Sequence, residues 1–541
     1  MIKWTYKQIK LFRWKYIFYI GCIIVYTLIS LLTPIIGKYI IDILIPNKQL
    51  KMLVGISCVW LVVECFRNSI NIISENIYNF LKINCSYNIQ QKIIETMQHT
   101  PWSFLVKQDM LYLSTRIYND SNIVTEFVLG LTGNILSKLL MTIVAIGILI
   151  YIAGGLGIFL LAVIIIYVYV RYLYQKKLYN VIQKDRENQD TFLAEFLAQF
   201  LNMKFVQQYE IAKELIRKLN EKFQKYEKNS IDVQKTYSVF DGIDEMISSI
   251  GRVIIYLFGG YCIVMHKITI GEFVIVIDYF QMILGSIQEF TELDKKYKES
   301  KVSYARIKEL LNKKEQENGI QYCPKVNSIA CDRVFYKVNN QMIIQNFSYK
   351  FKRGNIYCIW GENGSGKTTF CNLIARFWDV LLGLYNDKID GKIKYNDIDI
   401  NYLDMRKMRR EQISFVEQEP YLIQGSIENN VFLTEHYSRR SLKNVIEKLK
   451  FDAIDTMMKE ERKIIDGKSE FSGGERQKIA LVRLFIKTAD VLLLDEPTSA
   501  LDVMSKKRVM DYLQDIKQDK IIIIISHDWE IAELCDKVVK I

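Results

Sequence analysis

Six stretches of mostly apolar residues occupy the first half of this 541-residue chain. Each is long enough to cross a lipid bilayer, which takes about 20 residues in a helix. The mean hydropathy of the whole chain is only +0.05, because the second half alternates like a soluble domain. We therefore predict membrane-spanning helices followed by a globular domain. The predicted spans are residues 14–41, 52–73, 127–153, 156–174, 246–265 and 271–290.

The connections between the predicted spans are very unequal in length. Three are short loops, whereas the connections after spans two and four run for about fifty to seventy polar residues with a helical pattern. Basic residues beside a span tend to stay in the cytosol, and the N-terminus carries Lys3, Lys7, Lys10, Arg13 and Lys15. We therefore place the N-terminus and both long connections in the cytosol. Three lysines in the external loops oppose this assignment but are outnumbered.

Charge and cysteine content argue against several other classes of protein. The formal net charge of +12 is interpreted as membrane topology, because no basic stripe with interleaved aromatic residues marks the soluble half, and no nucleic-acid partner is predicted. The ten cysteines are scattered without a C-x-x-C pair, so neither a disulfide framework nor a zinc site is expected. The first apolar stretch lacks an A-x-A-like cleavage site, which favours a retained helix over a signal peptide.

A glycine-rich loop in the second half gives the first indication of an activity. It follows an apolar segment, 357–360, that is predicted to be a buried strand. In a G-x-x-x-x-G-K-[ST] loop, glycines let backbone N–H groups close around phosphate, and the following helix points its positive end at the anion. The lysine is expected to reach the β- and γ-phosphates, and the next threonine to ligate magnesium. The loop comprises Gly361, Glu362, Asn363, Gly364, Ser365, Gly366, Lys367, Thr368 and Thr369.

Three further elements follow in the same domain. Residues 491–494 form an apolar strand that delivers Asp495 and Glu496 to the edge of a sheet, where Asp495 can hold magnesium and Glu496 can polarise the attacking water. Residues 472–474, Ser-Gly-Gly, introduce a helix and make a second phosphate-binding element. His527 follows a run of five isoleucines at the predicted end of another strand.

Taken together in their order along the chain (361–369, 472–474, 491–496 and 527), the four elements resemble the ATPase domain of ABC transporters. The resemblance implies that ATP and Mg2+ bind, that Gln418 is the lid glutamine that touches magnesium and water, and that His527 senses the γ-phosphate. The implied catalytic residues are Glu496, His527 and Gln418, and the implied magnesium ligands are Thr368, Gln418 and Asp495. ATP would contact the loop 361–369 together with Ser472, Gly473, Gly474 and Glu475.

The resemblance also implies a site shared between two chains. In ABC proteins the serine–glycine element of one chain completes the nucleotide site of the other. Each chain here has one complete set of elements, so a homodimer is the default expectation and a heterodimer with a related half-transporter remains an alternative.

The membrane half is similar to the transmembrane domain of ABC exporters. Residues 100–104 with 114–120 resemble the first intracellular loop, and 195–210 resemble the second. The resemblance implies a multi-domain fold in which a six-helix transmembrane bundle has long cytosolic helical extensions. An α/β P-loop ATPase domain with a helical subdomain follows it. We expect the bundle at 1–311, a linker at 312–326 and the ATPase domain at 327–541, with the protein in the plasma membrane.

Several features depart from the family pattern. The strand pattern places Val338 where the family usually has a tyrosine that stacks on adenine, with Tyr336 as the alternative platform. Residues 464–470 lack the usual Gly-Glu-x-Gly sequence, for which Asp466 could supply a similar charge. The sequence stops short of the family's closing hairpin and helices. No peptidase segment precedes the first span, so leader cleavage is not expected.

The predicted function is ATP-driven export of an amphipathic or peptide-like molecule, either a small molecule, a lipid or a peptide. An importer or regulator on the same scaffold is the alternative, and a non-transporting ABC ATPase is a third class. Ionisable groups at membrane depth normally face a cavity or a partner. Candidate cavity residues are Asp278 and Gln281, with Asp278 favouring a cationic or hydrogen-bond-donating substrate, and Glu64 and Arg67, which alternatively pair along one helix face.

Overall fold

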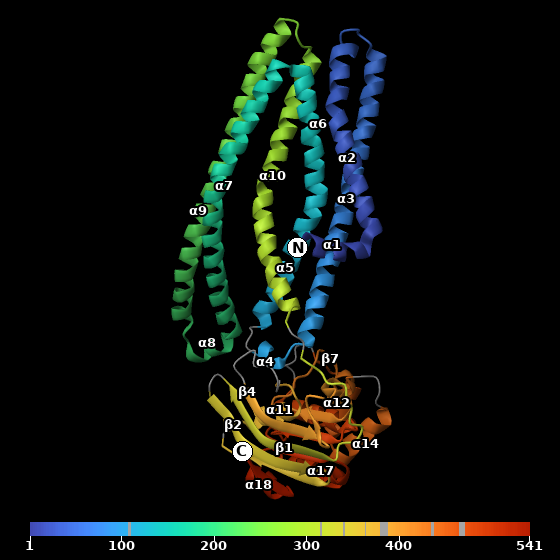
Figure 1. The fold of residues 1–541 in the computed structure, drawn as a ribbon, viewed down its shortest axis with the longest axis vertical. Helices are drawn as coiled ribbons and strands as arrows, with labels where there is room; N and C mark the ends of the chain where they lie inside the picture. Colours follow the sequence, from blue (N-terminus) through green and yellow to red (C-terminus); the bar gives the residue numbers. More distant parts are fainter. Residues whose placement is uncertain are drawn as a thin grey trace. The chain divides into compact units, whose positions relative to one another are not determined.

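A computed structural model describes residues 1–106, 110–313, 316–338, 341–362, 364–378, 388–433, 438–464 and 471–541 (Figure 1). The chain divides into two units. The membrane unit comprises Met1–Glu95 and Leu111–Asn312, and the ATPase unit comprises Thr96–Met110 and Lys313–Ile541. The segment that contains the short helix α4, Trp102–Leu105, thus groups with the ATPase unit, where the backbone N–H of Gln316 donates to the carbonyl of His99.

The described part of the membrane unit is helical, and most of its helices are long. They are α1 Ile2–Ile9, α2 Arg13–Tyr39, α3 Leu50–Gln98, α5 Met110–Gly130, α6 Leu136–Ala153, α7 Gly155–Leu201, α8 Met203–Tyr209, α9 Ala212–Val264 and α10 Ile270–Leu311. A π-helical turn, Ile40–Leu44, extends α2, and a second, Leu131–Ile135, joins α5 to α6. A capping box fixes the start of α10, because Thr269 and Glu272 exchange side-chain and backbone hydrogen bonds.

Four helical stretches among the described residues are long and apolar enough to cross a membrane: Ile2–Leu44, Leu113–Ile152, Ala212–Val264 and Ile270–Phe290. They coincide with the first, third, fifth and sixth predicted spans. The second and fourth, 52–73 and 156–174, lie within α3 and α7, which do not meet that criterion over the described residues. The second carries the charged residues Glu64 and Arg67.

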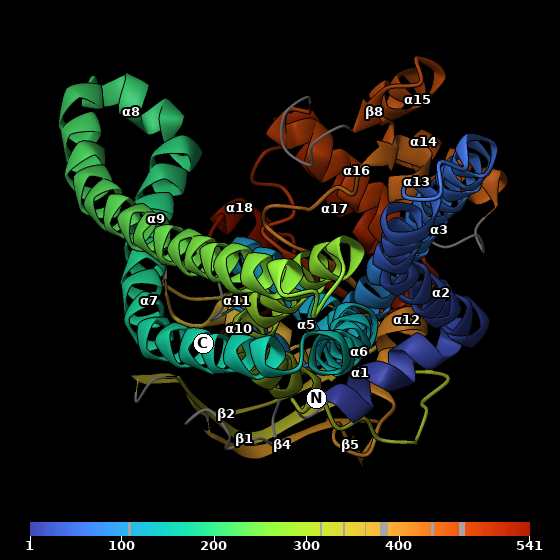
Figure 2. The same ribbon diagram turned by 90° about the horizontal axis from the view of Figure 1, so that it is seen from above.

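Helices α7 and α9 form an arm that extends away from α2 and α3 and is closed by α8 (Figures 1 and 2). Near its tip, the ring of Phe192 packs against Phe223 and Tyr226 at centroid distances of 5.7 and 5.8 Å. Lys218 and Glu195 form an ion pair at 3.1 Å between the same helices. The short helix α8 lies within the segment predicted as the second intracellular loop.

The described residues of the ATPase unit form three sheets. The central one is parallel, in the order β11-β3-β10-β9-β6, and an antiparallel sheet has the order β2-β1-β4-β5. The third sheet is the small pair β7-β8. The strands are β1 Ser328–Val338, β2 Gln341–Lys352, β3 Asn355–Trp360, β4 Lys388–Tyr395, β5 Ile398–Asp399, β6 Ile413–Val416, β7 Gly425–Ser426, β8 Lys463–Ile464, β9 Val491–Asp495, β10 Ile521–Ile525 and β11 Lys537–Lys540.

The helices of the ATPase unit cover both faces of the parallel sheet. Besides α4, they are α11 Lys367–Ile374, α12 Met405–Glu411, α13 Ile427–Phe432, α14 Arg439–Leu449, α15 Asp452–Lys459, α16 Gly473–Ile486, α17 Val503–Ile516 and α18 Trp529–Glu533. Successive strand residues point to opposite faces. On β9, Val491 and Leu493 join a core with α11 and the antiparallel sheet, whereas Leu492 and Leu494 join a core with α16 and α17.

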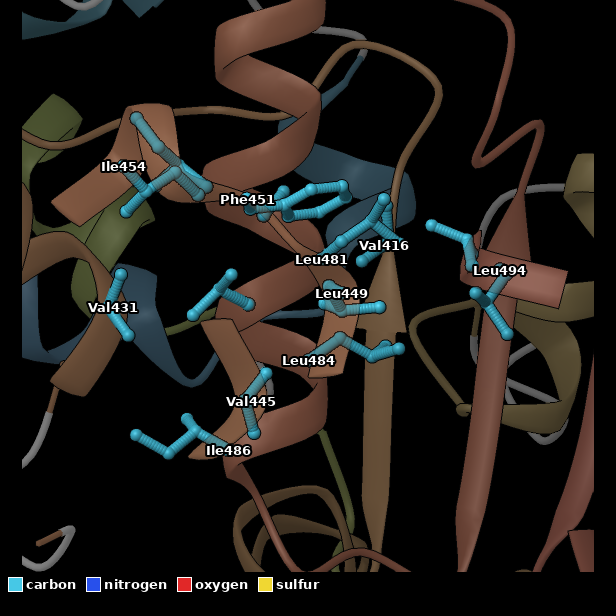
Figure 3. Close-up of a cluster of buried hydrophobic side chains, with 14 of the residues drawn as sticks. Val416, Val431, Val445, Leu449, Phe451, Ile454, Leu481, Leu484, Ile486 and Leu494 are labelled. Atoms are coloured by element: carbon cyan, nitrogen blue, oxygen red, sulfur yellow. The ribbon is translucent and has the colours of Figure 1, made fainter. Parts of the chain in front are cut away.

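Figure 3 shows the second of these cores, in which side chains of α16 and α14 pack beside the strands that carry Val416 and Leu494. The alternation repeats on β10, where Ile522 and Ile524 belong to the α16 side, and Ile521, Ile523 and Ile525 belong to the α11 side. A fully apolar strand sequence is therefore required, because both faces of this sheet are buried.

Candidate nucleotide site

Four of the predicted site segments follow strands of the parallel sheet and lie at one edge of it. Strand β3 leads into the glycine-rich loop, β9 ends at Asp495, β6 is followed by Gln418, and β10 is followed by His527. Because these strands are parallel, their carboxyl ends share one edge, which is where ligands bind in open α/β sheets. The topology of the sheet thus brings Gly361 and His527 to the same edge, although they are 166 positions apart in the sequence.

The loop after β3 requires glycine at specific positions. Gly364 and Gly366 have φ angles of +83° and +92°, which side-chain-bearing residues rarely adopt. A Cβ atom on Gly366 would also lie 2.6 Å from Cγ2 of Ile343. The side chain of Lys367 is buried, and its Nζ donates hydrogen bonds of 2.8 Å to the carbonyls of Gly361 and Glu362. Asn363 lies outside the described residues.

The loop has the donor pattern that a phosphate requires. Helix α11 begins at Lys367, directly after the loop, so its free N–H groups and positive dipole end lie at the loop. The Oγ atom of Ser365 is buried and has no hydrogen-bond partner among the described residues. Such an atom is costly unless a ligand satisfies it, so the loop suits an anion that accepts hydrogen bonds.

Glu496 is held through both its backbone and its side chain. Its backbone has a positive φ of +45°, a conformation that costs free energy in a non-glycine residue and is enriched at functional sites. Its N–H donates to the carbonyl of Ile525 at 3.0 Å. One carboxylate oxygen lies 2.7 Å from Nδ1 of His527, and the other accepts a 2.8 Å hydrogen bond from Nε2 of Gln418. These contacts bring together the three residues predicted to be catalytic.

Asp495 is a buried carboxylate at the end of β9. It is 4% exposed, and burial raises the pKa of its carboxyl group; the charge of Glu496 adds to this rise. A hydrogen bond from Thr368 and the charge of Lys367 act in the opposite direction. Among the described residues no group of three or more His, Cys, Asp or Glu residues could hold a metal by itself. One carboxylate with a hydroxyl nevertheless suits Mg2+, which takes its remaining ligands from water and phosphates.

The serine–glycine element forms the N-terminus of α16. Ser472 and Glu475 make a capping box, in which the Ser472 Oγ accepts from the Glu475 N–H at 3.2 Å and the Ser472 N–H donates to the Glu475 carboxylate at 2.7 Å. A Cβ atom on Gly474 would lie 2.8 Å from the carbonyl oxygen of Ala500, so glycine permits this close approach. Ser472 and Gly473 are exposed, which leaves this helix end accessible to another molecule.

One residue of the site had no role in the sequence analysis. Gln477 is 1% exposed, and its Nε2 donates to the Glu496 carbonyl at 2.8 Å while its Oε1 accepts from the Ala500 N–H at 2.9 Å. It ties α16 to the turn that carries Glu496. The sequence feature that could have indicated this role is a glutamine near the start of α16, at a position on the buried face of the helix.

Two of the predicted departures from the family pattern concern Val338, at the adenine position, and residues 464–470, before the serine–glycine element. Val338 is the last residue of β1 and pairs with Gln341 of β2. Tyr336 is 1% exposed and its ring packs against Trp378 at 6.2 Å, so the alternative that Tyr336 offers a face to adenine is wrong. Residues 465–470, including Asp466, lie outside the described residues.

The polar residues predicted in the membrane spans fall into two groups. Glu64 and Arg67 form an ion pair of 2.7 Å, and Thr33 on α2 donates to Glu64 at 3.0 Å, so the pairing alternative is the one observed. Asp278 is half-buried on α10 and makes no hydrogen bond or ion pair with the described part of the chain. Gln281, one turn further along α10, is exposed.

Comparison with known families identifies both units. A family model described as ABC transporter matches residues 344–499, and one described as ABC transporter transmembrane region matches residues 16–287. The chain has the same fold as a bacterial Atm1-family ABC exporter solved with ATP bound. That structure has a TM-score of 0.79 and 15% sequence identity, and the match covers 98% of this chain and 93% of that one.

Curated relatives include proteins with different cargoes in their names. The transport/processing ATP-binding protein ComA of Streptococcus pneumoniae serotype 4 is 24% identical over 544 residues, or 96% of this chain and 73% of ComA. The lactococcin-A transport/processing ATP-binding protein LcnC of Lactococcus lactis is 24% identical, over 96% and 72% of the two chains. An ATP-dependent lipid A-core flippase of Haemophilus ducreyi is 27% identical, over 56% and 52%. The chain therefore belongs to the ABC transporter family, as a multi-pass membrane protein of the exporter type whose cytoplasmic domain hydrolyses ATP.

Proposed function

We propose that two such chains form an exporter that hydrolyses ATP at two composite sites and moves an amphipathic or peptide-like molecule outward across the plasma membrane. One observation carries the hydrolytic part of this proposal. Glu496 is held between His527 and Gln418 by hydrogen bonds of 2.7 and 2.8 Å at the end of a buried strand.

In this site Glu496 polarises the attacking water. His527 contacts one of its carboxylate oxygens and senses the γ-phosphate. Gln418 donates to the other carboxylate oxygen and, as the lid glutamine, would touch magnesium and water. Lys367 gives up its contacts with its own loop and contacts the β- and γ-phosphates instead. Asp495, Thr368 and Gln418 would hold Mg2+, which supplies positive charge to the phosphate oxygens when it is bound. The protein's contribution is therefore positioning and electrostatic stabilisation.

The arrangement of α11 and α16 supports a site shared by two chains. Helix α11 packs in the core on one face of the parallel sheet, and α16 packs in the core on the other face. The sheet thus separates the glycine-rich loop of a chain from its own serine–glycine element. The exposed Ser472 and Gly473 are available to a nucleotide on the loop of a second chain, as a homodimer requires. A heterodimer with a related chain would satisfy the same geometry.

The arm of α7, α8 and α9 also suits a dimer. Its tip exposes large apolar side chains, among them Phe200 at 65%, Leu201 at 72% and Tyr209 at 64%. An exposed apolar patch of this kind at the end of a cytosolic extension indicates a protein partner. We assign α8 as a coupling helix of the kind that the resemblance to ABC exporters implies.

The substrate class follows from the relatives and from the membrane unit. Relatives named for lactococcin-A transport and for lipid A-core flipping point to peptide-like and amphipathic lipid substrates. Asp278 and Gln281 are proposed to face the transport cavity, since Asp278 has no partner in the described part of the protein. Glu64 and Arg67 instead stabilise the contact between α2 and α3.

The test is directional transport in proteoliposomes. Vesicles with the ATPase unit facing outward receive a fluorescent amphipathic peptide or a labelled phospholipid in the outer solution or outer leaflet. An exporter moves the probe into the lumen or inner leaflet when Mg-ATP is added, and the Lys367→Ala variant does not. ATP-dependent loss of a preloaded probe from the lumen would instead support the importer alternative.

A further inference from the structure

A cavity of about 220 Å³ lies within the membrane unit, between α3, α5 and α10. One part of its lining is apolar and includes Phe127, Leu131 and Leu293. These residues lie at the cytosolic ends of the third and sixth predicted spans, where α5 and α10 continue into the cytosolic extensions. A molecule taken from the cytosol or the inner leaflet would meet this cavity before it reached the middle of the membrane.

The polar part of the lining has an excess of negative charge. Three carboxylates, those of Glu126, Glu289 and Glu299, face one ammonium group, that of Lys296. Glu126 forms an ion pair of 2.6 Å with Lys82, and Lys296 forms one of 3.3 Å with Glu292. Glu289 is half-buried and makes no hydrogen bond or ion pair with the described part of the chain. The cavity therefore contains a carboxylate that has no ion-pair or hydrogen-bond partner among the described residues.

The backbone beside the cavity is irregular. The π-helical turn Leu131–Ile135 supplies Leu131, Asn134 and Ile135 to the lining. Such turns are rare and are often found at functional sites, because they widen a helix and redirect its side chains. Within this turn a Cβ atom on Gly133 would lie 2.1 Å from Oη of Tyr19, so the turn is also packed closely against α2. This irregularity is independent of the charge distribution.

We propose that this cavity is a loading site for amphipathic cations, in which Glu289 receives the positive group and the apolar wall receives an adjoining ring or alkyl group. The proposal rests on the proposed export function and names its substrate class. A neutral ligand would leave the Glu289 carboxylate uncompensated, and an anion would be repelled by it. Tyr78, which also lines the cavity, offers a ring face that attracts cations.

The position of Glu289 on α10 connects the cavity with Asp278. The two residues are eleven positions apart, which is about three helical turns or about 16 Å along one face of the helix. Neither makes a hydrogen bond or ion pair with the described residues. A cation loaded at Glu289 would therefore find, deeper in the membrane, a second carboxylate that is unpaired among the described residues.

The test is binding of benzyltrimethylammonium to the full-length protein in phosphatidylcholine nanodiscs without ATP, measured by isothermal titration calorimetry. Glu289→Gln should weaken binding about tenfold, the size expected for one partly screened charge pair. Lys296→Gln should strengthen it, because it removes the opposing charge. Benzyldimethylamine N-oxide, which is similar in shape but has no net charge at pH 7, should respond to neither substitution.

Glu227→Gln is the matched control, since it removes the same charge from an exposed position on α9 outside the cavity lining. It should leave binding unchanged. The proposal is overturned if the parent protein does not bind benzyltrimethylammonium, if Glu289→Gln binds it as tightly as the parent, or if the N-oxide loses affinity equally. Binding without ATP is independent of hydrolysis and flux, so a failure of the export function would be recognised separately in proteoliposomes.

Discussion

The nucleotide site and the membrane unit differ in how their carboxylates are partnered by hydrogen bonds and ion pairs. In the ATPase unit, Glu496 has both carboxylate oxygens and both backbone polar groups engaged in hydrogen bonds. In the membrane unit, Asp278 and Glu289 have no such partner among the described residues, although both lie on a well-formed helix. The first arrangement fixes a geometry before the ligand arrives, whereas the second leaves a charge for the ligand to satisfy.

This difference determines how the function of each unit responds to amino-acid substitutions. A preorganised site loses most of its rate when one member moves, because its energy comes from positioning. A site that relies on an uncompensated charge responds to the sign of the charge and to ligand identity more than to small displacements. We therefore expect substitutions of the hydrogen-bonded residues at the nucleotide site to abolish turnover, and substitutions of the unpaired carboxylates on α10 to change substrate preference.

The largest effect is expected at the glycine-rich loop and at Glu496. Lys367→Ala should lower ATP turnover by about 100-fold or more, because a buried phosphate contact is lost. Glu496→Gln should also stop turnover but retain ATP binding and trap a closed dimer, since only water activation is removed. ATPase rates, nucleotide binding and dimer state by size-exclusion chromatography distinguish the two variants.

The control for these variants is Lys350→Ala, which removes an exposed lysine of β2 in the same unit. Its ATPase activity should match that of the parent. Hydrolysis by Glu496→Gln at the parent rate would show that another group activates the water.

A smaller effect is expected when two defective chains are mixed. Lys367→Ala inactivates the glycine-rich loop of one chain. Ser472→Arg blocks the serine–glycine element at the exposed start of α16 in the other chain. A dimer with one chain of each kind contains one intact composite site, so ATPase activity should reappear where each variant alone has none. Zero activity in purified mixed dimers, with cooperativity between two sites excluded separately, would contradict the shared site.

The parts of the fold that followed from sequence are those with strong periodic or sequential constraints. The apolar segments 357–360 and 491–494 were predicted as buried strands and lie within β3 and β9. The long helices were predictable because a bilayer span demands a long apolar run. The membrane family match confirms the transmembrane character of the region that contains α3 and α7.

The missed details depend on packing between distant segments. Gln477 looked like an ordinary helix residue, and only the approach of the turn at Ala500 gives it two buried hydrogen bonds. Tyr336 has an aromatic ring that could stack on adenine, but its side chain lies on the face of β1 that packs into the core shared with α11. The cavity beside the π-helical turn has no sequence motif, because it depends on where α3, α5 and α10 pass one another.

A moderate effect is expected at the adenine position of the ATPase unit. Base stacking on an aromatic ring is worth about 1–3 kcal/mol, so Val338→Tyr should tighten ATP binding by about tenfold. Tyr336→Ala removes a buried ring and should lower the melting temperature, while the folded fraction keeps its nucleotide affinity. Calorimetric titration and thermal unfolding measure the two effects, and unchanged affinity in Val338→Tyr would show that adenine is held elsewhere.

The smallest effect is expected at Asp278 and separates the two kinds of charged residue within the membrane unit itself. Asp278→Asn removes an uncompensated charge, so ATPase stimulation by a cationic amphipathic peptide should fall about two- to threefold, as expected for a partly screened charge, while basal ATPase stays at the parent level. Glu64→Gln should behave differently, because it leaves the half-buried Arg67 without its 2.7 Å partner and should lower thermal stability before it changes stimulation. Stimulated and basal ATPase rates, measured with melting temperatures in the same nanodiscs, test this contrast. Equal loss of both rates in Asp278→Asn would assign Asp278 a structural role like that of Glu64, and the distinction between the two charges would then fail.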